Sequence, residues 1–243
     1  MAITIREEQD AGSNTAGISF TTGAGMLTTD KLLLVQCNDF YTAANMTTPT
    51  GTAGSSWTLQ ATVDNGTNNT HMKVWTSDVA SAGAQTVVVN NSTTDEERYA
   101  ALFVLTGTAS GIDGVASTAS GASSTSHVAP SVTPTSGQSD DLLICVWASS
   151  RSVPNEGSGP VNYTLPGSMI AYTERDMGIY ITYRAGSELL SSSGATGTRT
   201  ATASPASTFQ TVSVLVKSAS AASPAPTRPV VAPSYAAIRA SSW

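Results

Sequence analysis

Charged side chains are scarce in this chain. Only 12 % of its 243 residues are Asp, Glu, Lys or Arg, and 11 basic residues against 17 acidic ones give a formal net charge of −6. Sequence-independent binding to nucleic acid relies on clustered Lys and Arg that displace counterions from phosphates. The sequence contains no such cluster, so we do not expect nucleic acid as a partner.

Long apolar runs are also missing. No stretch approaches the roughly 18 consecutive apolar residues that a membrane-spanning helix requires. The N-terminal residues, MAITIREEQDAGSN, carry charges where a secretory signal peptide has its apolar segment. We therefore expect a protein that is made in a cytoplasm and does not insert into a membrane.

Residues that commonly carry chemistry are few. Cys37 and Cys145 lie in two separate apolar runs and are predicted to be buried free thiols, although neighbouring strands would allow a disulfide. His71 and His127 have no nearby companions of the kind that a metal site needs. No G-x-S-x-G motif of a serine hydrolase occurs. We expect no enzyme activity, no cofactor and no metal site.

Acidic residues offer one remaining route to catalysis, because two carboxylates can hydrolyse a glycosidic bond. The candidates are Asp95, Glu96, Glu97, Asp140, Asp141, Glu156, Glu174 and Asp176. Several of them adjoin turn signals at strand entrances, where a solvated charge is the ordinary explanation. Asp30 and Asp141 precede equivalent apolar strands, so their recurrence needs no catalytic reason.

The chain contains a degenerate internal duplication. MLTTDKLLLVQCNDF at 26–40 corresponds to SGQSDDLLICVWASS at 136–150. Four further pairs follow in the same order: SSWTLQATV with VNYTLPGSM, HMKVWTSDVASAG with GIYITYRAGSELL, AQTVVVNNS with GTRTATASP, and RYAALFVLTG with STFQTVSVLVKS. The pseudo-repeats therefore span about 26–107 and 136–217, with a join in ASGASSTSHVAPSVTPTSG.

The repeated segments have the pattern of β-strands. YITYRA and FQTVSVLVK alternate in side-chain character, whereas LLLVQC and LLICVW are apolar throughout and indicate strands covered on both faces. RYAALFVLTG can be read as a helix, but its counterpart FQTVSVLVK is rich in β-branched residues and favours a strand. The pattern predicts an all-β protein with a jelly-roll-like β-sandwich over 1–217 whose two halves complete one core. Two tandem sandwiches are the alternative.

The C-terminal residues 218–243 differ in composition. Four prolines among Ala and Ser favour an extended backbone. Large side chains follow them and predict a peptide that docks on a partner: Val230, Val231, Tyr235, Ile238 and Trp243. A neighbouring subunit is the expected partner, and folding back onto the chain's own sandwich is the alternative.

These motifs resemble virion proteins of tailed bacteriophages. The order of DKLLLV, an aromatic residue before Thr-Leu, VWTSDVA, TVVV and YAALFVLTG is similar to minor tail proteins of phages infecting actinobacteria, and so is the ending PTRPVVAPSYAAIRASSW. The resemblance implies a non-enzymatic subunit of the virion, assembled in the host cytoplasm with other tail or capsid proteins and present in several copies or as a homo-oligomer. A capsid decoration protein and a module that binds host cell-wall glycan are the alternatives.

Overall fold

The computed structural model describes residues 3–13, 17–38, 43–54, 56–65, 70–92, 97–135, 140–150, 160–177 and 181–219. Within these ranges the chain consists of antiparallel strands and one 3-10 turn, η1 (Ala43–Asn45). The predicted all-β sandwich is therefore confirmed. The first half contains β1 (Thr4–Ser13), β2 (Ile18–Thr21), β3 (Lys31–Asn38), β4 (Thr50–Gly51), β5 (Thr58–Asp64), β6 (His71–Asp78), β7 (Thr86–Val89) and β8 (Arg98–Thr106). The second half contains β9 (Thr108–Ala129), β10 (Leu142–Ser150), β11 (Asn162–Thr164), β12 (Ile170–Met177), β13 (Ile181–Leu189) and β14 (Arg199–Ser218).

The strands of the first half form two sheets, and β3 is the central strand of the larger one. Every residue of β3 is buried, which is what a continuous apolar run in the middle of a layered structure predicts. The five-stranded sheet has the order β1-β8-β3-β6-β5, and a three-stranded sheet, β2-β7-β4, covers its outer face. This pairing is the strand order of a jelly roll. The predicted strand at RYAALFVLTG is confirmed, because β8 pairs with β3 along the whole length of β3.

The second half repeats this arrangement. The order β9-β14-β10-β13-β12 matches β1-β8-β3-β6-β5 strand for strand. β9 and β14 are long enough to bend into the outer layer as well. There the part of β14 around Ala201 pairs with the C-terminal part of β9, and the part around Ala203 pairs with β11. In the first half, β7 pairs with β2 and β4 in the corresponding way.

The registers of the two halves agree residue for residue. Leu32 of β3 pairs with Val104 on β8, and Leu143 of β10 pairs with Leu215 on β14. The sequence separation between Leu32 and Leu143 equals that between Val104 and Leu215, so one constant offset relates the two ladders. The β6 and β13 registers have the same offset. Both hairpins at the sheet edge contain a bulge, after Leu59 in β5 and after Ala171 in β12.

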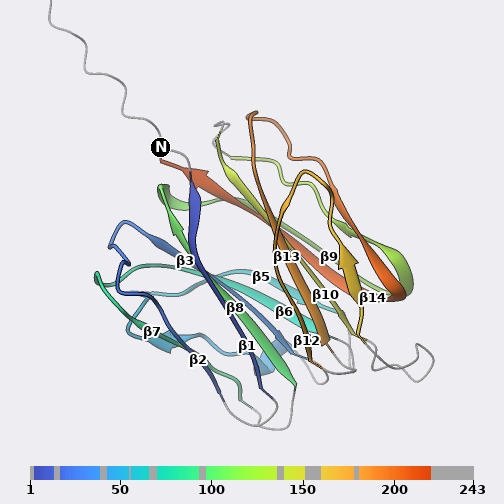
Figure 1. Ribbon diagram of the computed structural model, residues 1–243, viewed down its shortest axis with the longest axis horizontal. Coiled ribbons are helices and arrows are strands. Elements are labelled where there is room, and N and C mark those ends of the chain that lie inside the picture. Colours follow the sequence, from blue (N-terminus) through green and yellow to red (C-terminus); the bar gives the residue numbers. More distant parts are fainter. Residues whose placement is uncertain are drawn as a thin grey trace, which may run out of the picture.

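The two five-stranded sheets pack face to face. In Figure 1 the blue-to-green first half lies to the left and the yellow-to-red second half to the right. A shared core lies between the sheets and draws on both halves, with Phe103 and Leu33 from one half and Val214 and Ile144 from the other. Each half also has a core of its own beneath its outer layer. The structure thus has one core shared by the two halves and one further core within each half.

The halves are related by a pseudo-two-fold axis that runs along the strands. Across the shared core β1 lies against β12, and the equivalent strands β9 and β5 lie against each other on the opposite side. β8 contacts β13 in the same way, where the rings of Tyr99 and Tyr183 are 4.3 Å apart. Each half therefore uses the same surface to contact the other, as in an isologous dimer.

Two details differ from the sequence-based interpretation. The segment read as a join, ASGASSTSHVAPSVTPTSG, contains the C-terminal part of β9, and the halves meet instead at Gly107, which has a φ of 78°. The pairing of Trp57-Thr58-Leu59 with Tyr163-Thr164-Leu165 is wrong. Thr58 begins β5, whereas Tyr163 lies in β11, the counterpart of β4.

Candidate functional site at the tail-bearing end

The predicted docking residues lie beyond the described part of the chain. Val230, Val231, Tyr235, Ile238 and Trp243 all follow Ala219, the last residue that the structure describes. The structure does show where this C-terminal segment starts. It begins at the end of β14, beside the start of β9 and the end of β8 (Figure 1).

The start of the segment is fixed by backbone hydrogen bonds. The Ser218 amide donates to Oδ1 of Asp141 at 2.8 Å, and the Ala219 amide donates to the Gly107 carbonyl at 3.0 Å. Ser218 also faces Thr108 across the β14–β9 ladder. These bonds hold the last described residues against the crossover between the halves, so the point of departure of the segment is well defined.

A buried pair of carboxyl groups lies next to this anchor. Asp113 and Asp141 are each only 1 % exposed, and their side chains are hydrogen-bonding neighbours. The pKa of Asp141 is raised, mainly by burial and further by Asp113, while the hydrogen bond from Ser218 opposes the rise. Asp113 in turn accepts a hydrogen bond from the Thr135 hydroxyl at 2.7 Å.

The same position in the first half holds an ion pair. Asp30 is the counterpart of Asp141, and its Oδ1 lies 3.5 Å from the Arg6 guanidinium. Arg6 follows Ile5 just as Asp113 follows Ile112, and both isoleucines face equivalent residues of β8 and β14. The duplication therefore keeps the aspartate and exchanges its cationic partner for a second acid.

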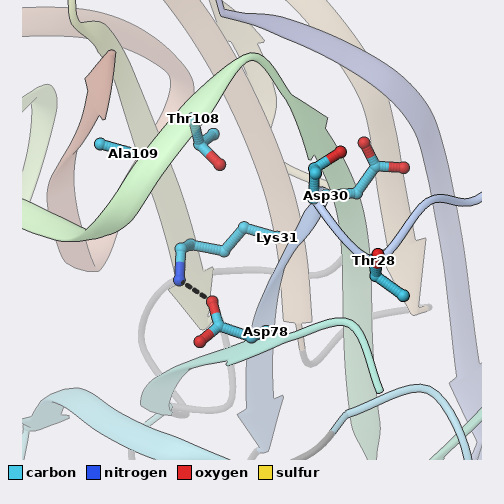
Figure 2. A pocket seen from close by; sticks show the side chains of 7 residues that line it. Thr28, Asp30, Lys31, Asp78, Thr108 and Ala109 are labelled. Carbon is cyan, nitrogen blue, oxygen red and sulfur yellow. Dashed lines mark hydrogen bonds and ion pairs between the residues drawn. The ribbon is translucent and has the colours of Figure 1, made fainter. Parts of the chain in front are cut away.

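A hollow of about 270 Å³ opens at this end of the molecule, as Figure 2 shows. Its wall contains the start of β3, the end of β6 and the first residues of β9. Lys31, whose side chain is 7 % exposed, contacts Asp78 across the β3–β6 ladder, with 2.5 Å between Nζ and Oδ1. Their counterparts in the second half are Leu142 and Leu189, and Leu189 is 46 % exposed.

The other candidate residues are dispersed or buried. His127 stacks on Phe209 and hydrogen-bonds to the Tyr163 hydroxyl and the Ser124 carbonyl, and burial lowers its pKa. His71 is also buried, with Nδ1 2.9 Å from Asp64. The predicted free thiols are confirmed, and Cys37 lies in the shared core whereas Cys145 lies in the core of the second half.

The predicted carboxylates do not form an accessible pair in the described structure. Glu174 accepts a hydrogen bond from the Tyr163 amide and lies 3.7 Å from the Arg184 guanidinium. Asp95, Glu96 and Glu156 lie outside the described residues, as does the side chain of Asp176. The pair that does form, Asp113 with Asp141, is closed to substrate by burial. Across the described ranges no three His, Cys, Asp or Glu side chains gather as a metal site would require.

Aromatic side chains contribute to the cores. Trp75, Trp147, Tyr163 and Tyr183 are buried, and Trp57 is partly buried against the core of the first half. The large apolar side chains exposed on the described surface are Leu27, Leu59, Ile170 and Leu189. A glycan-binding platform of exposed rings is therefore absent from the described surface. Tyr180 lies outside the described residues.

Comparisons with known proteins identify no relative. No protein-family model, no curated protein and no solved structure matches the chain. Among the described residues, no helix is long and apolar enough to cross a bilayer.

Sequence reasoning missed the acidic pair for a physical reason. Asp113 stands in GIDGV, a segment without strong alternation, and nothing in the sequence aligns it with Arg6. The correspondence emerges only from the pairing of β9 with β14, which places Asp113 beside the end of the second jelly roll.

Proposed function

We propose that this protein is a non-enzymatic structural subunit of a bacteriophage virion, a minor tail protein at the tail tip that contributes to assembly and host adsorption. The observation that carries the proposal is a sandwich whose strands are complete before the C-terminal segment begins. Residues up to Ser218 complete both jelly rolls, and the segment 220–243 follows them.

The fold leaves no equivalent strand position for this segment. In the first half the chain leaves β8 through Gly107 and becomes β9, which pairs with β14 of the second half. By the pseudo-two-fold, a chain leaving β14 would become a strand on β8. That position is occupied by β1, which pairs with β8 from Thr4 to Ser13. We infer that the segment after Ala219 serves a purpose outside the sandwich.

Its composition supports docking on another protein. Proline reduces the entropy that an extended segment loses when it is immobilised, and the large side chains Val230, Tyr235 and Trp243 can fill pockets on a neighbour. Arg228 and Arg239 are its only charged residues, whereas the whole chain is acidic. Such a segment suits a partner surface with apolar pockets and some negative charge.

Immunoelectron microscopy tests the proposal. Antibodies raised against residues 1–219 are applied to purified particles of the phage that encodes this chain. Label at the tail tip is the expected result, and adsorption assays with the isolated protein then follow. Label spread over the head would replace the proposal by a capsid decoration protein anchored by its C-terminal segment. Particles without label, although the epitope is accessible in controls, would contradict both.

A further inference from the structure

We propose that the acidic pair of Asp113 and Asp141 is a pH-sensitive switch that sets how firmly the end of β14, and with it the start of the C-terminal segment, is held to the sandwich. Acid conditions keep this end closed, and it opens as the pH rises. The inference concerns residues of this chain alone and does not rest on the proposed place in a virion. It follows from a comparison of two equivalent sites, one in each half.

The two sites have the same backbone geometry, because each is built on a bulge. In the first half the register of β1 shifts just after Ile5, so that Arg6 is the extra residue. In the second half the register of β9 shifts just after Ile112, and Asp113 is the extra residue. A bulge changes the direction of a side chain. In both halves the side chain of the extra residue meets the aspartate that directly precedes the central strand.

The charge of the bulge residue distinguishes the two sites. In the first half the Arg6 guanidinium lies 3.5 Å from Asp30 and compensates its charge. In the second half Asp113 and Asp141 are both acids, and each is 1 % exposed. Two neighbouring carboxyl groups that are removed from water ionise together only at a large cost. The closed site therefore retains a proton more readily than a solvated aspartate does.

The pair is bonded directly to the end of β14. Oδ1 of Asp141 accepts the Ser218 amide at 2.8 Å, and Ser218 is the last residue of the strand. The structure describes one residue more, Ala219, whose amide donates to the Gly107 carbonyl at 3.0 Å. The end of a strand opens at a lower free-energy cost than its interior. Opening this end is therefore the least costly way to bring a charged Asp141 into contact with water.

Asp113 is held more firmly than the end of β14. The Thr135 hydroxyl donates to its carboxylate at 2.7 Å, and the Thr135 amide donates to its carbonyl at 3.1 Å. Its backbone lies within β9, where Ile112 and Gly114 on either side pair with β14. Repulsion between the two carboxylates is therefore relieved where Asp141 binds Ser218.

Other charged groups are compensated or lie at the surface. The elements around the pair contribute Asp140 just before β10, Lys217 on β14, Glu188 on β13, and Lys31 and Asp78 in the hollow. Glu188 is bound to Arg199 at 2.7 Å, Lys31 is bound to Asp78, and Asp140 is exposed. Burial raises the pKa of Asp141, and the charge of Asp113 adds to this rise. The titration of the site therefore belongs to the pair.

Hydrogen exchange, measured residue by residue by NMR on the full-length chain, tests the switch. A raised pKa in the closed state makes that state most stable below the ordinary aspartate value of about 4 and destabilises it as the pH rises. Between about pH 4.5 and pH 8, the protection of the Ser218 amide, corrected for the intrinsic exchange rate, is expected to fall by about tenfold for each pKa unit by which the pair is raised.

The first half supplies the internal control. The Leu27 amide donates to Oδ2 of Asp30 at 2.8 Å, and the partner of Asp30 is Arg6, which keeps its charge across this pH range. The protection of the Leu27 amide is therefore expected to stay constant. An equal fall at Leu27 and Ser218 would show that the whole protein loses stability, and would overturn the proposal.

Two variants separate the charge from the hydrogen bonds. Asp141→Asn keeps an oxygen that accepts the Ser218 amide and removes the titrating group, so the protection of Ser218 is expected not to change with pH. Asp113→Asn removes the second charge and leaves Asp141 buried, so a smaller fall than in the wild type is expected. Constant protection of Ser218 in the wild type, or an undiminished fall in either variant, would overturn the proposal. A fall at the Thr135 amide without one at Ser218 would also overturn it, because the site would then open on the side of Asp113.

Discussion

Asp141 lies beside Asp113 at the position where the other half of the molecule places Asp30 beside Arg6. The backbone and the first aspartate are the same, so the two sites differ mainly in the sign of one partner. Burial makes this difference important, because a charge removed from water depends on its neighbours for compensation. In the first half a cation compensates the buried aspartate, whereas in the second half burial and the neighbouring acid raise the pKa of Asp141.

The acidic pair predicts a dependence of stability on pH. The pKa of Asp141 is raised in the folded state, so its contribution is full below the ordinary aspartate pKa of about 4 and is lost as the pH rises through the folded value. Asp113→Asn keeps a hydrogen-bonding group and removes the second charge. We expect the variant to be more stable than wild type at pH 7 by about 1 kcal/mol.

Urea unfolding at pH 4, 5.5 and 7 measures this effect. The advantage of Asp113→Asn over wild type is expected to shrink as the pH falls, because the wild-type pair then carries its proton. Thr135→Val removes the hydroxyl that binds Asp113 and serves as the control for simple loss of a hydrogen bond. A difference between wild type and Asp113→Asn that does not change with pH would show that repulsion is not the cause.

The two cysteines are expected to be unreactive in the folded protein. Burial raises the pKa of Cys145 to about 12, and it raises that of Cys37 as well. The thiolate is the reactive form, so neither residue should react with a disulfide reagent at pH 8, and both should react in guanidinium chloride. If one thiol per chain reacts under native conditions, the core that contains that cysteine must open.

The pKa of His127 is expected to be lower in the folded protein than in the unfolded chain. Burial lowers its pKa below the ordinary value, although the Ser124 and Ser207 carbonyls act against this. With Nε2 donating to Ser124, Nδ1 accepts from the Tyr163 hydroxyl. Its contribution to stability is full above about pH 6.5 and is lost as the pH falls through the lower folded value. The imidazole resonance of His127 should titrate at a lower pH in the native protein than in urea; an equal or higher midpoint in the native protein would contradict burial.

The shared core is expected to couple the stability of the two halves. Phe103 is fully buried on β8 and packs edge-on against Tyr172 of β12, with ring centroids 5.7 Å apart. Phe103→Ala should destabilise the protein by about 3–5 kcal/mol. Hydrogen exchange should accelerate in β10 as well as in β3, because the cavity lies between the sheets. Acceleration confined to the first half would mean that the halves unfold independently.

Removal of Ser223–Trp243 separates the body from the C-terminal segment. Because residues up to Ser218 supply the strands of both jelly rolls, we expect the truncated chain to keep its thermal midpoint within about 1 °C, a change well below about 0.5 kcal/mol. Incorporation into particles is expected to be lost. Normal incorporation of the truncated chain would contradict the docking role, and a large drop in the midpoint would indicate that the segment packs on its own sandwich.

The parts of the fold that sequence predicts are those with strong apolar patterns. β3, β8 and β10 stand out because they are covered on both faces, and their recurrence reveals the duplication. β9 is missed because its Ser, Thr, Ala and Gly residues lack alternation, and tertiary pairing with β14 makes it a strand. The sequence alone does not decide whether Asp30 corresponds to Asp140 or to Asp141. The constant offset between the β3–β8 and β10–β14 ladders shows that its counterpart is Asp141.

The candidate site was less predictable, because it depends on pairs of residues that only the fold brings together. Lys31 and Asp78 are 47 residues apart and meet through the β3–β6 ladder. Asp113 and Asp141 meet through β9, the strand that the sequence conceals. The equivalence of β1 with β9 and of β12 with β5 can be recognised only from the strand pairing.

The long ladder of β14 has a mechanical consequence. The C-terminal segment leaves directly from Ser218, and β14 pairs along its length with β9 on one side and with β10 and β11 on the other. A pull on the segment along the strand would load these hydrogen bonds together in shear, instead of breaking them one after another. A subunit tethered through this segment could bear tension at its attachment point while both jelly rolls stay folded.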